Sequence, residues 1–551
     1  FAMFFQGGFV DIHSHSNKHC GVRKTVVRTA WSIAIHDIRL YLRESIMNLN
    51  QPSRLATSTR TALLTAVLMM TVGTAHTVAS TDSGVGNRYA SSPAVTLGLE
   101  VSGIDKTDIA TYSEFAESLL ADATARVTAY GKGNVPAYAE HLKDVFIDGG
   151  FDPRDIHILP LDETVSLVVR YRGDGSSSRK PVVFSSHMDV VPAEAGEWVR
   201  NPFELQQDET FYYGRGVLDN KFDVSMLTTL FVWLKAQGFV PNRDLIIAFT
   251  GDEESLQNTV QDLTNNHRDL IDAEYAIVVD GGGGALNDSG EAIQYMVGFA
   301  EKTYATYTMT AKNIGGHSSM PRADNAIFDL AAAIQRIENH RFAIETNEIT
   351  RTYFERSAPF LDNEVGEAMR RFAANPKDEE AIEVLRAQPE YVGTLGTTCI
   401  PTMLSGGHAE NALPRTATAT INCRIFPGNS VGDIMGELRL VAGNPELEWA
   451  VYGMPVSSDT SPFNDEVMGA VEASLTQLYP GTPVIPRMIS GTTDGAYFRA
   501  AGIPSYSLTG IFLNPKDSFA HGLNERVRRA SIPESLIFWQ SMIRSIASDP
   551  N

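Results

Sequence analysis

Four short apolar runs, each ending in glycine or in acidic residues, constrain the fold of this chain more than any other feature. They are TVSLVVRYRG (164–173), KPVVFSSHMDV (180–190), RDLIIAFTGDEE (243–254) and AEYAIVVDGGGG (273–284). Helical periodicity precedes the first run, and a long helical stretch separates the second run from the third. Short apolar runs that alternate with helices predict an α/β fold, in which a mostly parallel sheet carries helices on both faces.

The pattern changes after Glu301, where TYATYTMTAK (303–312) alternates apolar and polar residues, as a half-exposed strand does. A helix, two strands that contain the cysteines, a second helix and a further strand follow. This β-α-β-β-α-β order is the split βαβ sandwich, which predicts a smaller α+β domain inserted into the larger one. Residues 344–394 are an acidic, helix-rich insertion within the smaller domain, and the α/β pattern returns after about Ser457.

The start of the chain indicates export. Two basic residues, the apolar run TALLTAVLMMTV (61–72) and a stretch of small residues follow one another, and this order predicts a secretory signal peptide over 47–79. The run is too short to span a membrane as a helix, and a short amphipathic or core helix is the alternative. Cleavage is expected after Ala79, or else after Ala75. Residues 1–46 are then an upstream segment without a structural role.

These patterns divide the rest of the chain into a large domain in two parts, 80–302 and 457–551, and a smaller domain over 303–456. The formal net charge of −21 at pH 7 argues against nucleic acid as a partner. We expect an exported protein, periplasmic or extracellular, without an integral membrane segment after signal cleavage.

Three cysteines are present, and one of them, Cys20, lies in the upstream segment. The other two, Cys399 and Cys423, lie on two predicted strands that form a hairpin around Asn411, each twelve residues from that centre. The two side chains could therefore face each other, in a compartment where disulfides persist. A disulfide and two buried free thiols are both compatible with the pattern.

Possible metal ligands collect where the predicted strands end. The segments SSHMDVVPA, YGRGVLDNK, TGDEES and VVDGGGG, with SFAHGLNERV far downstream, supply His187, Asp189, Asp219, Glu253, Glu254, Asp280 and His521. Each of these residues alone is more often a core side chain, a surface side chain or a helix cap. The carboxyl ends of parallel strands meet at one edge of a sheet, where adjacent carboxylates repel one another unless a cation is present. Two histidines with several carboxylates suit zinc better than calcium.

The chain resembles a known family through seven motifs in the same order: HMDVVPA, W…PF, YGRGVLDNK, GDEES, GGHSSMP, NALP…R and AHG. This family is the di-zinc peptidases of family M-20, which include glutamate carboxypeptidase, aminoacylase and the succinyl-diaminopimelate desuccinylases. The resemblance covers about residues 111–545, and the insertion at 344–394 is similar to that of the longer carboxypeptidase S-like branch. It implies a zinc-exopeptidase type of large domain and a smaller domain that serves as a lid and in dimerisation.

The resemblance implies two zinc ions per subunit. His187 and Asp280 would bind one ion, Glu254 and His521 would bind the other, and Asp219 would bridge the two. In the family the peptide bond after the bridging aspartate is cis, which here would be the bond after Asp219.

Two further acidic residues receive catalytic roles from the resemblance. Asp189 would lie behind His187 and fix its tautomer. Glu253 would be the general base, which takes a proton from the water held between the metals and passes it to the leaving amine. Successive side chains at a strand end point in different directions, so Glu254 can face the metal while Glu253 faces the water.

The smaller domain supplies three residues by resemblance. His317 would stabilise the oxyanion of the tetrahedral intermediate, often from the partner subunit of a dimer. Asn411 and Arg424 would hold the carboxylate of the substrate, because the planar guanidinium of arginine pairs with both carboxylate oxygens. The alternative for Arg424 is an ordinary surface ion pair.

Two other motifs are weaker candidates for functional sites. The segment DIHSH (Asp11–His15) is similar to the His-x-His of barrel amidohydrolases, but it precedes the signal segment and no suitable series of strands and helices follows it. The glycines after Asp280 lack the Lys-Ser/Thr of a phosphate loop, and more simply let the backbone turn close to a metal.

The sequence thus predicts an exported di-zinc metallo-exopeptidase of the carboxypeptidase or dipeptidase type, with a small peptide or N-acyl amino acid as substrate. The segment SGTTDGAYF (490–498) resembles a substrate loop of the family and places Gly491, Thr492 and Asp494 near the ligand. An N-acyl-amino-acid amidohydrolase of the aminoacylase type is the alternative within the class. A zinc-binding or peptide-binding protein without catalysis is the alternative outside it, and it would lack a general base such as Glu253.

Overall fold

The structure is a computed structural model that describes residues 105–548. The predicted upstream segment (1–46) and signal peptide (47–79) lie outside the described residues, as do Cys20 and the Asp11–His15 motif. In the part of the chain that is described, no helix is long and apolar enough to cross a bilayer.

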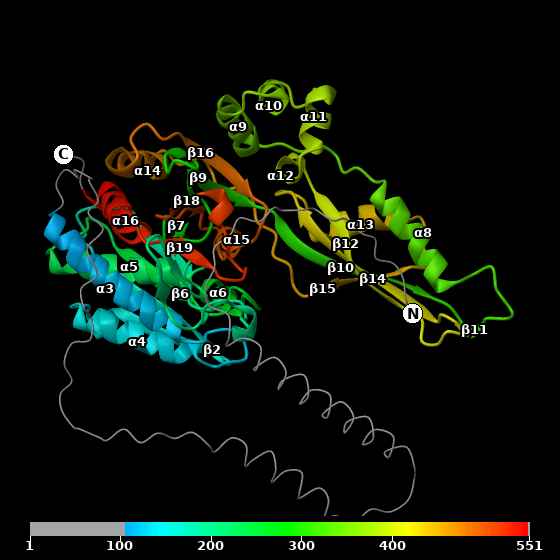
Figure 1. Cartoon of the computed structure of the whole chain (residues 1–551), viewed down its shortest axis with the longest axis horizontal. Coiled ribbons are helices and arrows are strands. Elements are labelled where there is room, and N and C mark those ends of the chain that lie inside the picture. Colours follow the sequence, from blue (N-terminus) through cyan, green and yellow to red (C-terminus); the bar gives the residue numbers. More distant parts are fainter. Residues whose placement is uncertain (1–104, 549–551) are drawn as a thin grey trace, which may run out of the picture. The chain divides into compact units, whose positions relative to one another are not determined.

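A ten-stranded mixed sheet forms the centre of the α/β part (Figure 1). Its order is β1-β2-β6-β3-β7-β17-β9-β8-β18, and β16 pairs with β9. The strands are β1 (Ile156–Leu161), β2 (Thr164–Tyr171), β3 (Val182–His187), β6 (Leu245–Thr250), β7 (Tyr275–Val278), β8 (Gly283–Leu286), β9 (Ala292–Glu301), β16 (Val484–Ile489), β17 (Ser505–Ser507) and β18 (Phe512–Leu513). The central strands β6, β3, β7 and β17 run parallel, whereas β2 is antiparallel to β6 and β9 is antiparallel to β17.

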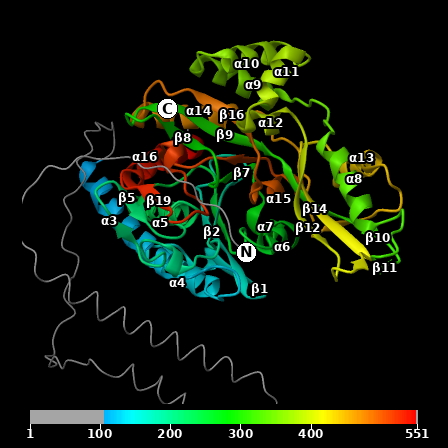
Figure 2. The ribbon, with the colours of Figure 1, turned by 45° about the vertical axis from the view of Figure 1, so that its right-hand side comes forward.

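Helices cover both faces of this sheet, as the apolar runs predict (Figure 2). One layer consists of α3 (Lys106–Ala125), α4 (Val135–Asp148), α5 (Lys221–Ala236), α14 (Asp465–Leu478) and α16 (Ser531–Ala547). The other consists of α6 (Asn258–Asn266), α7 (Arg268–Ile271) and α15 (Gly495–Ala500). Successive strand residues face opposite layers, so Phe184 and Ile247 pack in the first core and Val183 and Ile246 in the second.

A separate three-stranded sheet joins two segments that are distant in the sequence. It has the order β19-β5-β4, with β4 (Gln206–Gln207), β5 (Phe211–Tyr213) and β19 (Arg526–Arg528). The segment that follows β5 leads into the YGRGVLDNK motif, and the segment that precedes β19 contains the AHG motif. This sheet therefore brings the two motifs side by side.

The smaller α+β part has the predicted β-α-β-β-α-β order. Its elements are β10 (Thr303–Lys312), α8 (Ala326–Glu338), β12 (Thr398–Gly406), β14 (Thr416–Ile425), α13 (Val431–Ala442) and β15 (Glu448–Tyr452), with β11 (Gly316–His317) and β13 (Ala412–Leu413) forming a short separate pair. The four-stranded sheet has the order β12-β14-β10-β15, and apolar residues of α8 and α13 pack on one of its faces. The domain boundaries at 302/303 and 456/457 stay a prediction.

The hairpin around Asn411 has the predicted register. Cys399 lies opposite Cys423 where β12 pairs with β14, and the two residues form a disulfide. The sequence left a disulfide and two free thiols open, and the structure contains the disulfide.

The insertion contains four α-helices with a core of their own. They are α9 (Glu348–Ser357), α10 (Glu364–Ala374), α11 (Glu379–Arg386) and α12 (Pro389–Val392). Although smaller-domain elements flank the insertion in the sequence, α9 lies against β16 of the large sheet, where Arg356 Nη1 donates a hydrogen bond of 2.8 Å to the carbonyl of Val484 (Figures 1 and 2).

Candidate metal centre

The predicted metal ligands come from three adjacent strand ends and two loops. His187 is the last residue of β3, Glu254 follows β6, and Asp280 follows β7. Asp219 lies two residues before α5, and His521 lies in the loop before β19. Because β3, β6 and β7 are parallel neighbours, their carboxyl ends open on the same edge of the sheet, where ligands of such sheets bind.

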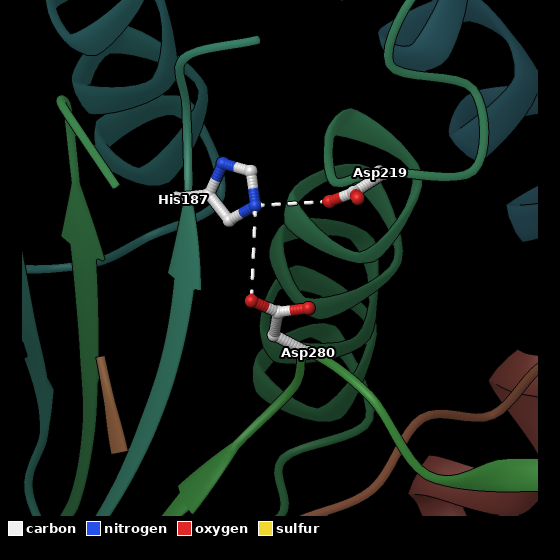
Figure 3. A group of neighbouring side chains, drawn as sticks. All are labelled: His187, Asp219 and Asp280. Carbon is white, nitrogen blue, oxygen red and sulfur yellow. Dashed lines mark hydrogen bonds and ion pairs between the residues drawn. The ribbon is translucent and has the colours of Figure 1, made fainter. Parts of the chain in front are cut away.

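A first donor group contains His187, Asp219 and Asp280 (Figure 3). His187 Nε2 lies 3.1 Å from Asp219 Oδ1 and 3.9 Å from Asp280 Oδ2. The imidazole is 1% exposed, whereas the two carboxylates are partly exposed. The three side chains thus point toward one another from three different segments of the chain.

A second donor group contains Asp219, Glu254 and His521. His521 Nε2 lies 3.2 Å from Asp219 Oδ2 and 2.9 Å from Glu254 Oε1. The ligand atoms of each group lie within 4.8 Å of one another. Asp219 belongs to both groups and presents a different oxygen to each histidine, which is the geometry that a bridging ligand needs.

The protonation of the cluster reflects its crowded carboxylates. Burial lowers the pKa of His187, but the carboxylates of Asp189 and Asp219 outweigh it, so this pKa lies well above its ordinary value. Hydrogen bonds with Asp219 and Glu254 raise the pKa of His521 to about 10. Burial, with a further contribution from the charge of Asp219, raises the pKa of Asp280 well above its ordinary value. Without a cation the cluster retains protons, and metal binding would release them.

Asp189 lies behind the first donor group. Its carboxylate accepts the backbone N–H groups of Glu253 and Glu254, each at 3.0 Å. Nδ1 of His187 lies 3.1 Å from the Asp189 carbonyl oxygen and 3.4 Å from Asp189 Oδ1. A proton on Nδ1 is therefore held by Asp189, and Nε2 is left to face Asp219 and Asp280, as expected of a residue that fixes the tautomer.

The two adjacent glutamates after β6 take different positions. Glu254 belongs to the second donor group, whereas Glu253 belongs to neither group. Gln257 Nε2 donates a hydrogen bond of 3.1 Å to Glu253 Oε1. Burial raises the pKa of Glu253 well above its ordinary value, and the nearby carboxylates of Asp280 and Glu254 add to this. Glu253 is thus a carboxylate with a raised pKa beside the predicted metal ligands, which is compatible with its predicted role as general base.

The peptide bond between Asp219 and Asn220 is cis, as the family resemblance implied. Asn220 Nδ2 donates a hydrogen bond of 2.7 Å to the carbonyl of Val279, next to Asp280. The loop before α5 is therefore attached to the segment that follows β7.

The structure does not bring His317 and Asn411 to this centre. Both side chains are exposed, and neither residue belongs to a donor group. They lie together at the tip of the smaller domain, where β11 pairs with β13 and the N–H of Ser318 donates to the Asn411 carbonyl at 3.0 Å. In Figure 1, β11 lies at the end of the smaller sheet that is remote from β6 and β7.

Arg424 lies at the opposite end of β14, close to the predicted substrate loop. Its Nη1 donates a hydrogen bond of 3.3 Å to the carbonyl of Ser490, and its guanidinium carbon lies 4.5 Å from the centre of the Tyr304 ring. Among the described residues no carboxylate forms an ion pair with Arg424, which argues against the surface ion pair as its role. Asn411 and Arg424 of one chain are separated by the length of β14, so they do not form a single carboxylate site within one chain.

The residues predicted for the substrate loop lie in two environments. Thr492 Oγ1 donates to the Lys302 carbonyl at 3.1 Å, and Thr492 and Gly491 are partly exposed beside Ser490. Asp494 is 3% exposed and accepts the hydroxyl of Thr250 at 2.5 Å, so the structure gives no support to direct ligand contact at Asp494.

Sequence reasoning gave no role to two charged residues of the centre, Arg215 and Glu525. Arg215 Nη1 lies 2.5 Å from Glu525 Oε2, and the two side chains are 3% and 0% exposed. Both residues stand within the quoted motifs YGRGVLDNK and SFAHGLNERV. The available signal was their position beside predicted ligands, but nothing in the spacing connects the two motifs.

Comparison with known proteins identifies a family for this chain. The sequence profile described as Peptidase family M20/M25/M40 matches residues 183–545. Probable carboxypeptidase S-like 2 of Dictyostelium discoideum is 28% identical over 395 residues, which are 69% of this chain and 74% of that protein. N-fatty-acyl-amino acid synthase/hydrolase PM20D1 of Xenopus tropicalis is 28% identical over 382 residues, which are 67% of this chain and 73% of that protein.

Solved structures share the fold. The M20 family metallo-carboxypeptidase Sso-CP2 from Sulfolobus solfataricus superimposes with a TM-score of 0.58 at 20% identity, over 80% of this chain and 99% of that one. The YXEP protein of Bacillus subtilis, described as a dinuclear metal binding peptidase, gives a TM-score of 0.51 at 10% identity over 80% of this chain and 99% of that one.

Proposed function

The chain belongs to peptidase family M20/M25/M40 and is a hydrolase, and from this premise we propose that it is an exported di-zinc exopeptidase of the carboxypeptidase or dipeptidase type. It would hydrolyse the amide next to a C-terminal residue that carries a free carboxylate. The single observation that carries this proposal is that Asp219 belongs to both donor groups and turns one oxygen to each histidine. The donor set of two imidazole nitrogens and three carboxylates fits zinc.

Bound zinc would lower the pKa of a water molecule and polarise the scissile carbonyl. Glu253, which lies in neither donor group, accepts a proton from the attacking water and delivers it to the leaving amine. The Asp189 carboxylate orients the segment after β6 that contains Glu253, because it accepts two backbone hydrogen bonds of 3.0 Å from that segment. The general base and the ligand Glu254 are thereby held in fixed relation to each other.

The environment of Arg424 favours a substrate that carries a free carboxylate. Its guanidinium has a lowered pKa because of burial, it forms no ion pair with a described carboxylate, and it lies against the loop at Ser490. A partly buried cation without an acidic partner is costly unless an anion binds to it during function. The C-terminal carboxylate of a peptide meets this need, and so does the carboxylate of an N-acyl amino acid.

The assay that tests the proposal is turnover of a dipeptide library by the purified protein, with metal analysis before and after chelation. We expect about two zinc ions per chain, cleavage of dipeptides, loss of activity on chelation and recovery on adding zinc. Absence of bound metal, or full activity after the metal has been removed, would refute the proposal.

An N-acyl-amino-acid amidohydrolase is the second candidate, and a specific observation favours it. Relatives named N-fatty-acyl-amino acid synthase/hydrolase match about two thirds of the chain, as the carboxypeptidase S-like relative does. The same metal centre serves both reactions, so the acyl side of the substrate decides between them. N-acetyl and long-chain N-acyl amino acids belong in the same assay, and a kcat/KM above that for every dipeptide would assign this activity.

We also propose a homodimer in which His317 and Asn411 act at the metal centre of the partner subunit. Their position at the exposed tip, remote from the ligands of the same chain, supports this arrangement. Strand β12 is an edge of the smaller sheet and exposes Ile400, Met403 and Leu404, which suits contact with a second copy. Mixing inactive His317→Ala and Glu253→Gln chains should restore activity in mixed dimers, whereas action within one chain predicts no recovery.

A further inference from the structure

We propose that Arg215 and Glu525 form a clamp that positions Asp219 and His521, and that the clamp sets metal affinity chiefly at the second donor group. This inference rests on the proposed metal centre and adds two positioning residues to it. Neither side chain belongs to a donor group, so the clamp would act only through the segments that carry the ligands.

The clamp begins with the three-stranded sheet. Strand β19 pairs with β5, and the backbone N–H of Gly214 donates to the carbonyl of Glu525 at 3.2 Å. Arg215 follows Gly214, and Asp219 follows four residues later. Glu525 stands four residues after His521. The pairing of β5 with β19 therefore holds the segment that contains Asp219 next to the segment that contains His521, although the two are remote in the sequence.

All described hydrogen bonds of the Glu525 carboxylate are formed with the loop that contains Asp219. Oε2 accepts from Arg215 Nη1 at 2.5 Å and from the Gly216 backbone N–H at 3.2 Å. Oε1 accepts the backbone N–H groups of Leu218 and Asp219 at 2.8 and 3.0 Å. The last of these bonds is made by the ligand residue itself, so the position of Asp219 depends directly on Glu525.

Arg215 reaches from the Asp219 loop back to the His521 loop. Its Nη2 donates to the carbonyls of His521 and Gly522, each at 3.3 Å. Its guanidinium carbon lies 5.0 Å from the centre of the Trp198 ring. Trp198 belongs to the W…PF motif, and the backbone N–H of Arg215 donates to the carbonyl of Pro202 in the same motif at 2.8 Å. The W…PF motif thus contacts both the backbone and the guanidinium of Arg215.

The burial of the Arg215–Glu525 pair indicates that the pair positions the ligand loops rather than adding to the stability of the fold. A fully buried ion pair loses most of its Coulombic gain to desolvation, and an apolar pair of similar volume is often as stable. The described side-chain hydrogen bonds of Arg215 and Glu525 all end on the two ligand loops. A packing role alone would not require that distribution.

The two donor groups differ in their dependence on the clamp. His187 is 1% exposed at the end of β3, and Asp280 lies two residues beyond β7, so the large sheet holds both. The His521 side chain is 54% exposed, and its residue has a positive φ of 62° in a loop. His521 is therefore held through its backbone, and loss of the clamp should affect the second group first.

The test is zinc titration of the full chain against a chromogenic chelator, with the variants Glu525→Gln and Arg215→Lys. The amide keeps the size of the carboxylate but can accept at only one atom, and lysine cannot donate to two segments from a planar fork. We expect one of the two zinc ions to bind about 10- to 100-fold more weakly in each variant, and the other, which shares only Asp219 with the clamp, to be weakened by a smaller factor. The matched control is Glu534→Gln, a buried carboxylate that bonds to Arg528 and Tyr479 instead.

Thermal unfolding of the metal-free variants separates positioning from folding. A merely structural pair would lower the metal-free unfolding temperature and leave both zinc affinities at wild-type values, which would overturn the inference. Equal weakening of both sites would overturn it as well. If Glu525→Gln does not fold, Arg215→Lys carries the test. Failure of the wild-type chain to bind two zinc ions would instead refute the proposed function, so the two failures are distinguishable.

Discussion

Asp219 Oδ1 lies 3.1 Å from Nε2 of His187. The other oxygen of the same carboxylate lies 3.2 Å from Nε2 of His521, so one side chain connects a buried strand end with an exposed loop. If both groups hold metal, both lose a ligand when the Asp219 carboxylate is removed.

Replacement of Asp219 by Asn should therefore reduce metal binding at both groups. An amide offers one oxygen acceptor and no negative charge, so it cannot serve two cations. We expect fewer than one zinc ion per chain after gel filtration and a loss of kcat/KM greater than about 100-fold, because even residues behind the ligands are worth 10- to 100-fold. Asp288→Asn, at an exposed ion pair with Lys516, is the control. Two retained zinc ions in Asp219→Asn would contradict the bridging role.

Glu253→Gln should separate chemistry from metal binding. The glutamine is isosteric but cannot accept a proton from water, and Glu253 lies in neither donor group. We expect unchanged zinc content with kcat lowered about 10²- to 10⁴-fold, the range of general base catalysis. Glu274→Gln, at a partly exposed ion pair with Arg179 and Arg243, is the control. Full activity of Glu253→Gln would remove the general base from the mechanism.

Arg424→Met should act on binding of the substrate carboxylate. A hydrogen bond to a charged group contributes about 1.5–3 kcal/mol, so kcat/KM for a free-acid substrate should fall about 10- to 150-fold. The corresponding C-terminal amide should be turned over equally by wild type and variant. Kinetics with the free acid and the amide check this, and an equal loss for both would assign Arg424 a structural role.

The sequence predicted the parts of the fold that have a regular hydrophobic period. The runs that become β3, β6 and β7 are apolar on both sides, which indicates burial between two helical layers, and residues at their carboxyl ends must share one edge. The closeness of the candidate ligands His187, Glu254 and Asp280 follows from that rule. The hairpin register that places Cys399 opposite Cys423 follows from the symmetry of two strands about Asn411.

Other features depend on contacts that the hydrophobic period of the sequence does not predict. The ion pair of Arg215 with Glu525 forms because β19 pairs with β5, and a pairing between short strands far apart in the chain leaves no local pattern. The resemblance implies one carboxylate site for Asn411 and Arg424, but within one chain the length of β14 places them at opposite ends of the smaller sheet. The packing of α9 on β16 likewise leaves no pattern in the sequence, because an apolar helix face does not specify its partner.

The disulfide gives a prediction about stability alone. It closes a loop of 24 residues between β12 and β14, and no predicted metal ligand lies on either strand. The double variant Cys399→Ser, Cys423→Ser should lower the free energy of unfolding by about 2–4 kcal/mol and leave zinc content unchanged. Urea unfolding and thiol titration of the denatured wild type check this. Two titratable thiols from Cys399 and Cys423 without reductant would contradict the bond.

Lys302 gives a prediction about pH. It lies between β9 and β10, is 1% exposed, and donates to the carbonyls of Gly393 and Gly396 at 2.9 and 2.7 Å. Burial lowers its pKa to about 7, with a further contribution from the charge of Arg424, while Glu345 acts in the opposite direction. The ammonium group is thus held at the C-terminal end of the helical insertion in a poorly hydrated place.

The sign of the effect follows from proton binding in the two states. Between about pH 7 and 10.5 the unfolded chain retains the Lys302 proton and the folded chain has released it, so raising the pH favours the folded state. The free energy of unfolding of the wild type, minus that of Lys302→Met, should rise by up to about 1.4 kcal/mol per pH unit in this window and stay level below it. Urea unfolding at a series of pH values, with the metal removed from both proteins, measures this difference, and parallel curves for wild type and Lys302→Met would contradict a lowered pKa at Lys302.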